Sequence, residues 1–547
     1  MLTRAALVLG LSAVVGWPAI ATIRETVRAR AARADAFPAT GASLDLAGST
    51  AMLQESGGAA RPFRLAIETV SLVAMTEAIA LPLGIVLAFF LARTTVPGRG
   101  LLLAVIGLSA FVPLPLHATA WLGALGNAGR AQALGVRPLL VGLPGAAFVH
   151  AMAALPWAIL IVAVGLTAVE PELEESALLD QAPVWVLLRV TLRRALGAIA
   201  AATLAIAVLT AGDMTVTDLL QIRTYAEEVY LQYSLGRGPG EAALVALPPL
   251  IVLGVLILVA ARGLGRFDAA RLVSAFHRAR PWSLGRWRIP CGVVLMALVG
   301  NAVALPLYSL VWRAGRVGGR ATLGQPPTWS LSGLLGTLRY ACGEIWEPLK
   351  ASLMWTAIAA TLTTLVVCSL AWSSRRSMAW RIVALGLLAL TLATPGPVAG
   401  MALVLGYRAF PVVYDSALMI VMAETLRTLP YSLLIIWPFL RSFPQDHLDA
   451  GALDGVGPWG VFFRVVLPLS RRPLVAAWAI SFAIGLGELP ATNLACPPGT
   501  QPMSVLVWGL LHTGVESHLA GVALIMLMVV AIAGLFAALT VRALRVM

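Results

Sequence analysis

Long apolar stretches recur along the whole chain and alternate with short polar segments. Twelve stretches approach or exceed about 20 residues, the length a helix needs to cross the hydrocarbon core of a bilayer. Pro113, Pro115 and His117 interrupt the third one. The pattern predicts an all-α polytopic membrane protein with about twelve transmembrane helices. The predicted spans lie near 4–23, 65–92, 100–125, 139–168, 194–217, 241–262, 290–312, 351–372, 381–406, 415–440, 473–495 and 517–541.

Composition supports a membrane protein. Hydrophobic residues make up 59% and charged residues 12% of the 547 residues, whereas soluble domains have about 45–50% and about 25%. The net charge of +13 comes mostly from arginines in the short segments between spans. Such arginines set membrane orientation, so we expect the lipid bilayer, and no nucleic acid, as the partner of this charge. Their bias favours an inner N-terminus, although the Arg-rich segment 24–64 would then lie outside. The first apolar stretch could be a signal peptide; we expect a first helix, because cleavage would leave an odd number of spans.

The chain repeats itself. Leu155-Pro156-Trp157 is matched by Leu429-Pro430-Tyr431 at an offset of 274 residues, and Gly212-Asp213 by Gly487-Glu488 at 275. Ordered polar and proline matches are unexpected between unrelated apolar sequences, so we predict two homologous six-helix halves. The halves are 1–262 and 290–547, joined by a cytoplasmic Arg-rich linker at 263–289.

Two corresponding inner loops, 170–192 and 444–468, are candidate docking sites. Each places acids early in a helix-capable stretch and small residues after them, which suits a surface helix that docks into a groove of another protein. An ordinary solvated connector is the alternative, but duplication at matching places argues against it. The candidate residues are Glu175, Ser176, Ala177 and Asp180 in the first loop, and Asp449, Ala450, Gly451, Asp454 and Gly455 in the second.

These loops resemble the EAA motif of binding-protein-dependent ABC importer permeases. The second loop fits through Asp449-Ala450-Gly451, Gly455 and Val466-Leu467-Pro468, whereas the first departs at Gln181 and Arg193. Two fused halves, and the stretch from Gly487 to Gly499, are similar to the iron(III) importer permeases. The resemblance implies a type I permease fold in the cytoplasmic (inner) membrane.

The chain holds no ATP-binding loop of its own. A Walker A loop needs Gly-Lys-Ser/Thr, and the single lysine, Lys350, lies in Pro-Leu-Lys-Ala. The resemblance therefore implies a pair of ABC ATPase subunits on the cytoplasmic side and a periplasmic or extracellular substrate-binding protein. We expect no catalytic residue, no metal site and no cofactor on this chain, since neither a nucleophile motif nor a metal-ligand spacing is present.

Four residues are candidates for a translocation path. Asp213 and Glu488 occupy equivalent places late in their spans, and Glu424 and Arg427 lie one turn apart in the tenth span. Charged groups within a membrane usually face a bundle interior or an aqueous cavity. The alternative for Asp213 and Glu488 is that each only caps a broken helix.

Function and substrate remain open at this stage. The leading hypothesis is an ABC permease for iron(III); thiamine, phosphonate or polyamine are alternative substrates. A twelve-helix secondary transporter would need coupling-ion residues in mid-membrane and no duplicated docking loops. A membrane-embedded enzyme would need a convergent polar cluster. Pairing of Cys342 with Cys496 is also left open.

Overall fold

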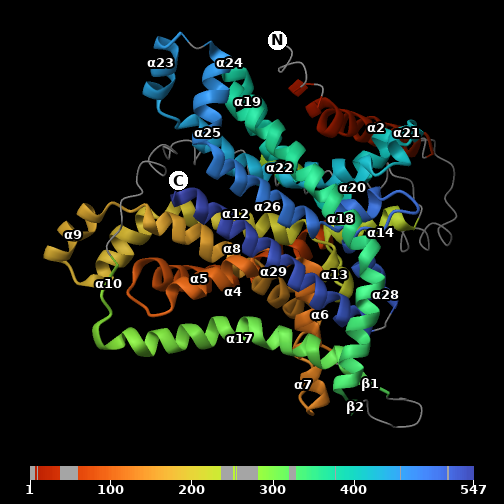
Figure 1. Cartoon of the computed structure of the whole chain (residues 1–547). Coiled ribbons are helices and arrows are strands. Elements are labelled where there is room, and N and C mark those ends of the chain that lie inside the picture. Colours follow the sequence, from red (N-terminus) through yellow and green to blue (C-terminus); the bar gives the residue numbers. More distant parts are fainter. Residues whose placement is uncertain are drawn as a thin grey trace.

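The protein is a bundle of long helices (Figure 1). The computed structural model describes residues 7–36, 60–235, 250–255, 281–318 and 328–546, apart from positions 9, 128, 253, 376, 456, 514 and 515. Within these residues six helices are long and apolar enough to cross a membrane, and up to ten spans result if each bent helix pair is one span. The six are α4 (Ala60–Arg93), α8 (Gly142–Thr167), α17 (Arg288–Ala314), α18 (Leu331–Ser374), α22 (Leu418–Arg441) and α29 (Glu516–Val546).

Two of the predicted spans are sharply bent. Helices α5 (Arg99–Ser109) and α6 (Leu114–Leu125) meet at 107°, and α19 (Met378–Ala393) and α20 (Gly396–Tyr407) meet at 110°. A proline with non-helical backbone angles directly precedes the second helix of each pair: Pro113 precedes α6, and Pro395 precedes α20. A proline has no N–H to continue a helix, but it is well suited to start the next one. The predicted interruption of the third span is therefore confirmed, whereas the break inside 381–406 was not foreseen.

Two further bends of 64° follow short surface helices. After α9 (Pro171–Asp180), the chain forms α10 (Pro183–Val186), the π-helical η2 (Leu187–Thr191) and α11 (Leu192–Arg194), then bends into α12 (Leu196–Ala211). After α23 (Gln445–Leu453), it forms α24 (Pro458–Val461), the π-helical η5 (Phe462–Val466) and α25 (Leu467–Leu469), then bends into α26 (Arg471–Leu486). Figure 1 shows α9 and α23 projecting from the same end of the bundle.

The remaining elements are short or peripheral. They are η1 (Ser12–Gly16), α2 (Trp17–Ala36), α7 (Arg130–Ala133), α13 (Thr215–Leu219), α14 (Tyr225–Ser234), η3 (Gly285–Trp287), α21 (Pro411–Tyr414), α27 (Pro490–Ala495), α28 (Met503–Thr513) and the strands β1 (Arg316–Val317) and β2 (Thr328–Trp329). The strands pair antiparallel, Arg316 with Trp329 and Val317 with Thr328.

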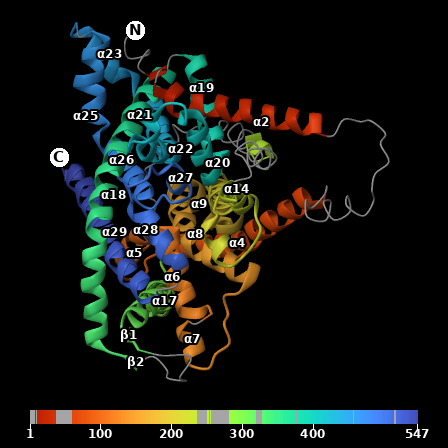
Figure 2. The ribbon, with the colours of Figure 1, turned by 90° about the vertical axis from the view of Figure 1, so that its right-hand side faces the viewer.

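The N-terminal helix and α17 each pack against a distant part of the chain. Helix α2 lies beside α20 (Figure 2), where the Trp17 indole donates to the Gly406 carbonyl at 2.6 Å. Helix α17 packs on α6 and α29, and Ser309 Oγ donates to the Ala120 carbonyl at 2.6 Å. The helix that begins each predicted half is thus bonded to a helix of the other.

The described spans differ from the predicted twelve in two places. The expected span 4–23 is not among the membrane-length helices found, since its apolar residues are divided between η1 and α2, and α2 continues into an Arg-rich segment. Most of the expected span 241–262 and most of the linker 263–289 lie outside the described residues.

Candidate functional site

A cavity of about 180 Å³ lies where the breaks and ends of several helices meet. The chain between α5 and α6 forms one wall, α8 and α22 supply a second, and the ends of α12 and α26 close it. Three of the four predicted path residues line it, together with three aromatic side chains and a histidine. These residues are Asp213, Arg427 and Glu488, with Phe111, Trp157, Tyr431 and His150.

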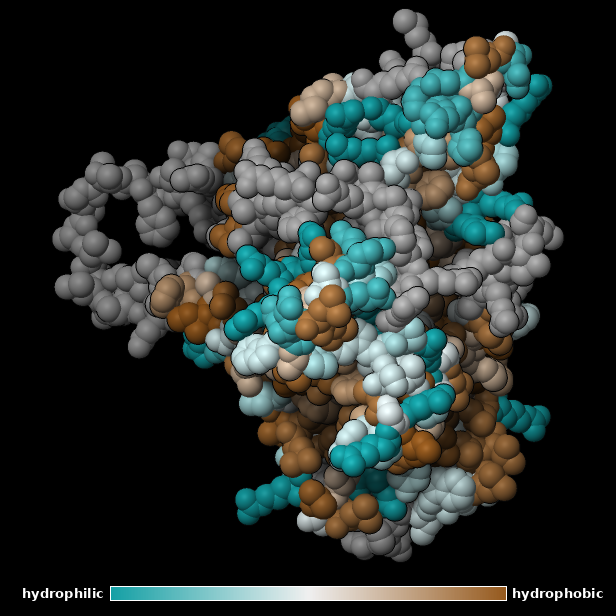
Figure 3. Space-filling model, turned by 90° about the vertical axis from the view of Figure 1, so that its left-hand side faces the viewer, coloured by the Kyte–Doolittle hydropathy of each residue, from teal (hydrophilic) through white to brown (hydrophobic). Residues whose placement is uncertain are grey.

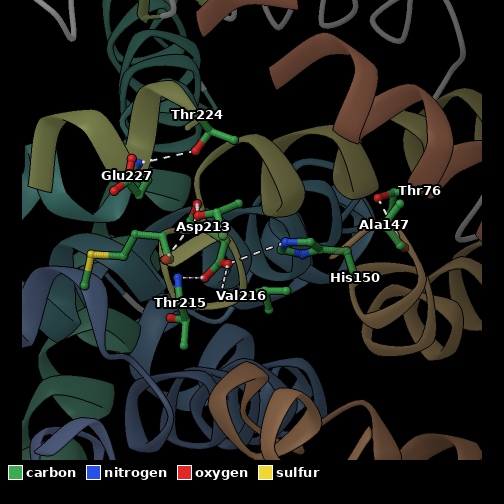
Figure 4. Close-up of polar contacts among 10 residues, drawn as sticks. Thr76, Ala147, His150, Asp213, Thr215, Val216, Thr224 and Glu227 are labelled. Carbon is green, nitrogen blue, oxygen red and sulfur yellow. Dashed lines mark hydrogen bonds and ion pairs between the residues drawn. The ribbon is translucent and has the colours of Figure 1, made fainter. Parts of the chain in front are cut away.

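Asp213 both lines the cavity and caps a helix. It follows the end of α12, and its two carboxylate oxygens accept hydrogen bonds from the backbone N–H groups of Thr215 (3.0 Å) and Val216 (2.9 Å) at the start of α13. Figure 4 shows the His150 ring pointing at the same carboxylate, with Nε2 3.5 Å from Oδ2. The backbone donors fix the direction of Asp213, so its position in the wall is set by the bend itself.

Glu488 has the corresponding arrangement at the end of α26. Its oxygens accept from the N–H groups of Ala491 (3.1 Å) and Thr492 (2.9 Å) and from Thr492 Oγ1 (2.7 Å), which caps α27. Arg427 Nε lies 3.7 Å from Glu488 Oε1, and Arg427 Nη1 donates to the Thr394 carbonyl at 2.8 Å. Both carboxylates thus cap a helix and also line the cavity, and their place on a translocation path stays a prediction.

Glu424 lies behind the cavity wall. Its side chain is buried between α22, α18 and α26, where Thr356 Oγ1 donates to Oε1 at 3.1 Å. Glu424 is one turn from Arg427 on α22, but it is not among the residues that line the cavity. The structure therefore brings Asp213, Arg427 and Glu488 to one cavity and places Glu424 in the packing between helices.

Glycines allow the helix ends to approach the broken spans closely. A Cβ on Gly487 would lie 2.7 Å from Cβ and Cγ of Pro113, and a Cβ on Gly212 would lie 3.8 Å from Cα of Pro395. Each glycine directly precedes one of the two capping carboxylates. The end of α12 thus meets the α19–α20 break, and the end of α26 meets the α5–α6 break.

Sequence reasoning missed His150 as a site residue and used Trp157 and Tyr431 only as repeat markers. A signal was available, because His150 lies 274 positions before Glu424, the same offset that relates Trp157 to Tyr431. Positions that pair in a repeat and hold polar residues in both copies merit attention even in an apolar helix.

The first docking loop exposes most of its predicted residues. Glu175, Ser176 and Asp180 are exposed on α9 and Ala177 is half-buried. The neighbouring Glu174, which sequence reasoning passed over, is buried. The helix ends at Gln181 with extended backbone, φ −131°.

The second docking loop exposes Asp449, Ala450, Asp454 and Gly455. Gly455 has φ +72°, in the left-handed region that glycine favours, so the chain can turn tightly there. Gly451 is buried, and a Cβ on it would lie 3.2 Å from Val461 Cγ2. The two loops thus turn differently, as the Gly-to-Gln difference suggested.

Each loop also carries a fully exposed leucine at the C-terminal end of its helix. Leu179 is 86% exposed and Leu453 is 88% exposed, and they lie 274 residues apart. Figure 3 looks onto this end of the bundle and shows hydrophobic side chains set among hydrophilic ones. A single exposed apolar side chain is common on protein surfaces, so the notable feature is that the two leucines occupy equivalent places in the two loops.

No metal-binding arrangement is present in the part of the chain that the structure describes: no three or more His, Cys, Asp and Glu side chains are grouped to hold an ion. Cys342 and Cys496 are both free thiols. Partial burial raises the pKa of Cys496 to about 11, and its Sγ donates to the Thr500 carbonyl at 2.8 Å, so it is a neutral, half-buried thiol.

Comparison with known proteins finds a family match in the second part of the chain. Residues 365–546 match the family described as binding-protein-dependent transport system inner membrane component. The matched range includes α22, α23, α26 and all of the Glu488 region.

Sugar permeases share shorter stretches with the chain. The diacetylchitobiose uptake permease NgcG of Streptomyces coelicolor is 43% identical over 58 residues, 11% of this chain and 19% of the relative. The maltose/maltodextrin permease MalF is 33% identical over 76 residues in Klebsiella aerogenes and 37% in Yersinia pestis, 14% of this chain and 15% and 14% of the relatives. The matches thus span less than a fifth of these relatives.

The family match agrees with the membrane-length helices and with the prediction of a permease rather than an enzyme. Residues 365–546 are thus similar to the inner membrane component of binding-protein-dependent transport systems, which agrees with a multi-pass, non-catalytic component of the inner membrane.

Proposed function

We propose that this chain is the complete transmembrane pathway of an ATP-driven importer. An external binding protein releases substrate to it, the substrate passes the cavity between Asp213 and Glu488, and a separate pair of ATPase subunits docks on α9 and α23. The observation that carries the proposal is the permease-family match over residues 365–546. The paired bends and equal helix lengths in the two parts of the chain support extending the proposal to both halves.

The proposal treats the chain as two related halves. The paired bends of 107° and 110°, and the two of 64°, support this. So do the positions of η2 and η5, and of α12 and α26, each shifted by 275 residues with equal lengths. The reciprocal contacts of Gly212 with Pro395 and Gly487 with Pro113 are what a pseudo-twofold axis through the cavity would produce.

Two equivalent docking helices fit a pair of identical ATPase subunits. Leu179 and Leu453 would enter the same groove on each subunit, with the exposed acids beside them at the groove rim. A central apolar anchor with a polar surround is the usual arrangement of energetically important interface residues.

Co-purification of the ATPase tests the docking proposal. The pair Leu179→Asp and Leu453→Asp should abolish retention of the ATPase subunits and ATP-driven uptake while the chain stays folded in the membrane. Val412→Asp is the matched control, because Val412 is 87% exposed but lies on α21, away from both loops (Figure 1). Undiminished retention by the double variant would overturn the docking role, and uptake that persists without any ATPase would favour a secondary transporter.

For the substrate we propose iron(III), on the resemblance of the 487–499 stretch to iron(III) permeases. The competing class is a sugar, supported by the similarity to NgcG and MalF, which are permeases for diacetylchitobiose and for maltose and maltodextrin. Uptake of radiolabelled iron, diacetylchitobiose and maltose by a strain that holds only this system separates them. Loss of sugar uptake on deletion, with iron uptake unchanged, would refute iron; thiamine, phosphonate and polyamine belong in the same panel.

A further inference from the structure

A buried arginine at the end of α4 joins several elements beside the first docking helix. Arg93 is 1% exposed. Its Nη1 donates to the Leu166 carbonyl at 2.6 Å, at the end of α8, and its Nη2 forms an ion pair with Glu174 Oε2 on α9. One guanidinium therefore fixes the ends of two membrane helices against the docking helix.

Glu174 extends this connection to η2, which follows α9 in the same loop. Its side chain is buried, and its second oxygen accepts a hydrogen bond from Thr191 Oγ1 at 2.5 Å, in the π-helical η2 that leads towards α12. Both carboxylate oxygens are thus engaged, one by Arg93, which precedes α9 in the chain, and one by Thr191, which follows α9. Helix α9 cannot turn or shift without breaking a hydrogen bond of a buried charge.

The backbone of Arg93 adds a fourth connection. The Trp282 N–H donates to the Arg93 carbonyl at 2.7 Å, and the Thr95 N–H donates to the Trp282 carbonyl at 3.2 Å. Trp282 lies just before η3 and α17. Movement of α9 is therefore linked through Arg93 to the segment that leads into α17.

The second docking loop is held in another way. Arg375, at the end of α18, donates to the carbonyls of Leu440 (3.0 Å) and Phe443 (3.1 Å). Its contact with Leu440 corresponds to that of Arg93 with Leu166. The residue that corresponds to Glu174 is Leu448, which is buried in an apolar cluster with Phe443 and Val461.

These two attachments have different mechanical properties. Apolar contacts are non-directional and tolerate small sliding movements. A buried ion pair adds little net stability, but it is costly to break and it holds its partners in one geometry. The first loop is thus attached rigidly and the second more compliantly.

We propose that Glu174, held by Arg93 and Thr191, is a positioning residue that transmits movement of the first docking helix to α4, α8, η2 and α17. The proposal rests on the proposed function, in which α9 receives the ATPase. It predicts that the chain depends on this ion pair for coupling more than for folding.

The test compares transport per ATP hydrolysed in vesicles that contain the full chain and its ATPase. The variant Arg93→Leu with Glu174→Leu removes both charges and makes the first loop resemble the second. It should retain the ATPase subunits and the wild-type thermal stability, while transport per ATP falls about fivefold or more, the range of typical coupling free energies. The matched control is Glu347→Leu with Lys350→Leu, which removes an exposed pair on α18 and should leave the ratio unchanged.

A second variant guards against misfolding. Glu174→Gln keeps the size of the side chain and one oxygen that can accept from Arg93, while its amide N–H can donate to Thr191 Oγ1. Because Arg93 keeps a hydrogen-bond partner, this variant should fold, exchange the amide hydrogens of α9 faster, and lower the same ratio to a smaller extent. An unchanged ratio and unchanged exchange in both variants would overturn the proposal. Failure of the proposed function would look different, since the wild-type chain itself would then show no ATP-driven transport.

Discussion

Replacement of Gly487 by alanine should disrupt the contact between the end of α26 and the α5–α6 break. The new methyl group would lie 2.7 Å from two ring carbons of Pro113 and 3.3 Å from its Cα. A proline ring cannot rotate aside, so the backbone has to shift. Overpacking of this kind costs about 1–3 kcal/mol, which corresponds to a change of about 5- to 150-fold in the population of this arrangement.

Gly212→Ala is the matched comparison, because across the equivalent interface its Cβ would lie 3.8 Å from Pro395 Cα, and its closest contact would be the Val208 carbonyl oxygen of its own helix at 3.1 Å. Gly386→Ala, with no atom within 4 Å, controls for the substitution itself. Thermal unfolding of the purified chain in detergent and uptake in vesicles should both be impaired in the order Gly487, Gly212, Gly386, the last unchanged. Equal effects at Gly487 and Gly386 would refute the steric argument.

Three further variants address the cavity and the loops. Arg427→Ala should reduce uptake with little loss of stability, because Glu488 keeps its three capping hydrogen bonds; parallel uptake and unfolding measurements check this. Glu174→Leu alone should destabilise the chain by about 3–5 kcal/mol, because the Arg93 charge stays buried without its partner, and the double leucine variant should recover most of the loss in a thermal unfolding assay. Gly455→Val should strain a backbone at φ +72° by about 1–2 kcal/mol and lower ATPase retention at limiting concentration.

The sequence predicts continuous apolar helices well and reorientations within them poorly. Spans such as α4, α8 and α22 follow from uninterrupted hydropathy. The bend between α19 and α20 was missed because both of its arms are apolar, so the stretch 381–406 has the hydropathy of one span. The signal was the Pro395-Gly396-Pro397 triplet, which resembles the already noted prolines at Pro113 and Pro115.

The site residues show a second limit. Sequence places Glu424 and Arg427 one turn apart, but three residues advance a helix by less than a full turn, and that difference decides which side chain reaches the cavity. In α9, a row of glutamates gave no sign of which one is buried. The available signal was in the other half, because the residue that corresponds to Glu174 is the apolar Leu448, and an apolar residue at that place favours an inward-facing position.

The two proposed halves share several structural features but divide their charges unequally. His150, Ala153 and Asp213 line the cavity from the first half. At the equivalent places of the second half, Arg427 and Glu488 line it, and Glu424 lies behind its wall. The capping carboxylates are retained in both, because each bend needs its helix start satisfied. The basic group varies, since it only has to pair with a carboxylate whose position is already fixed by backbone donors. In the docking loops it is the first half that carries the extra charges: a buried ion pair holds the first loop, and apolar packing holds the second. We infer that divergence within the proposed duplication has been confined to groups that the backbone geometry does not require, which leaves those groups available to set substrate preference at the cavity and coupling at the loops.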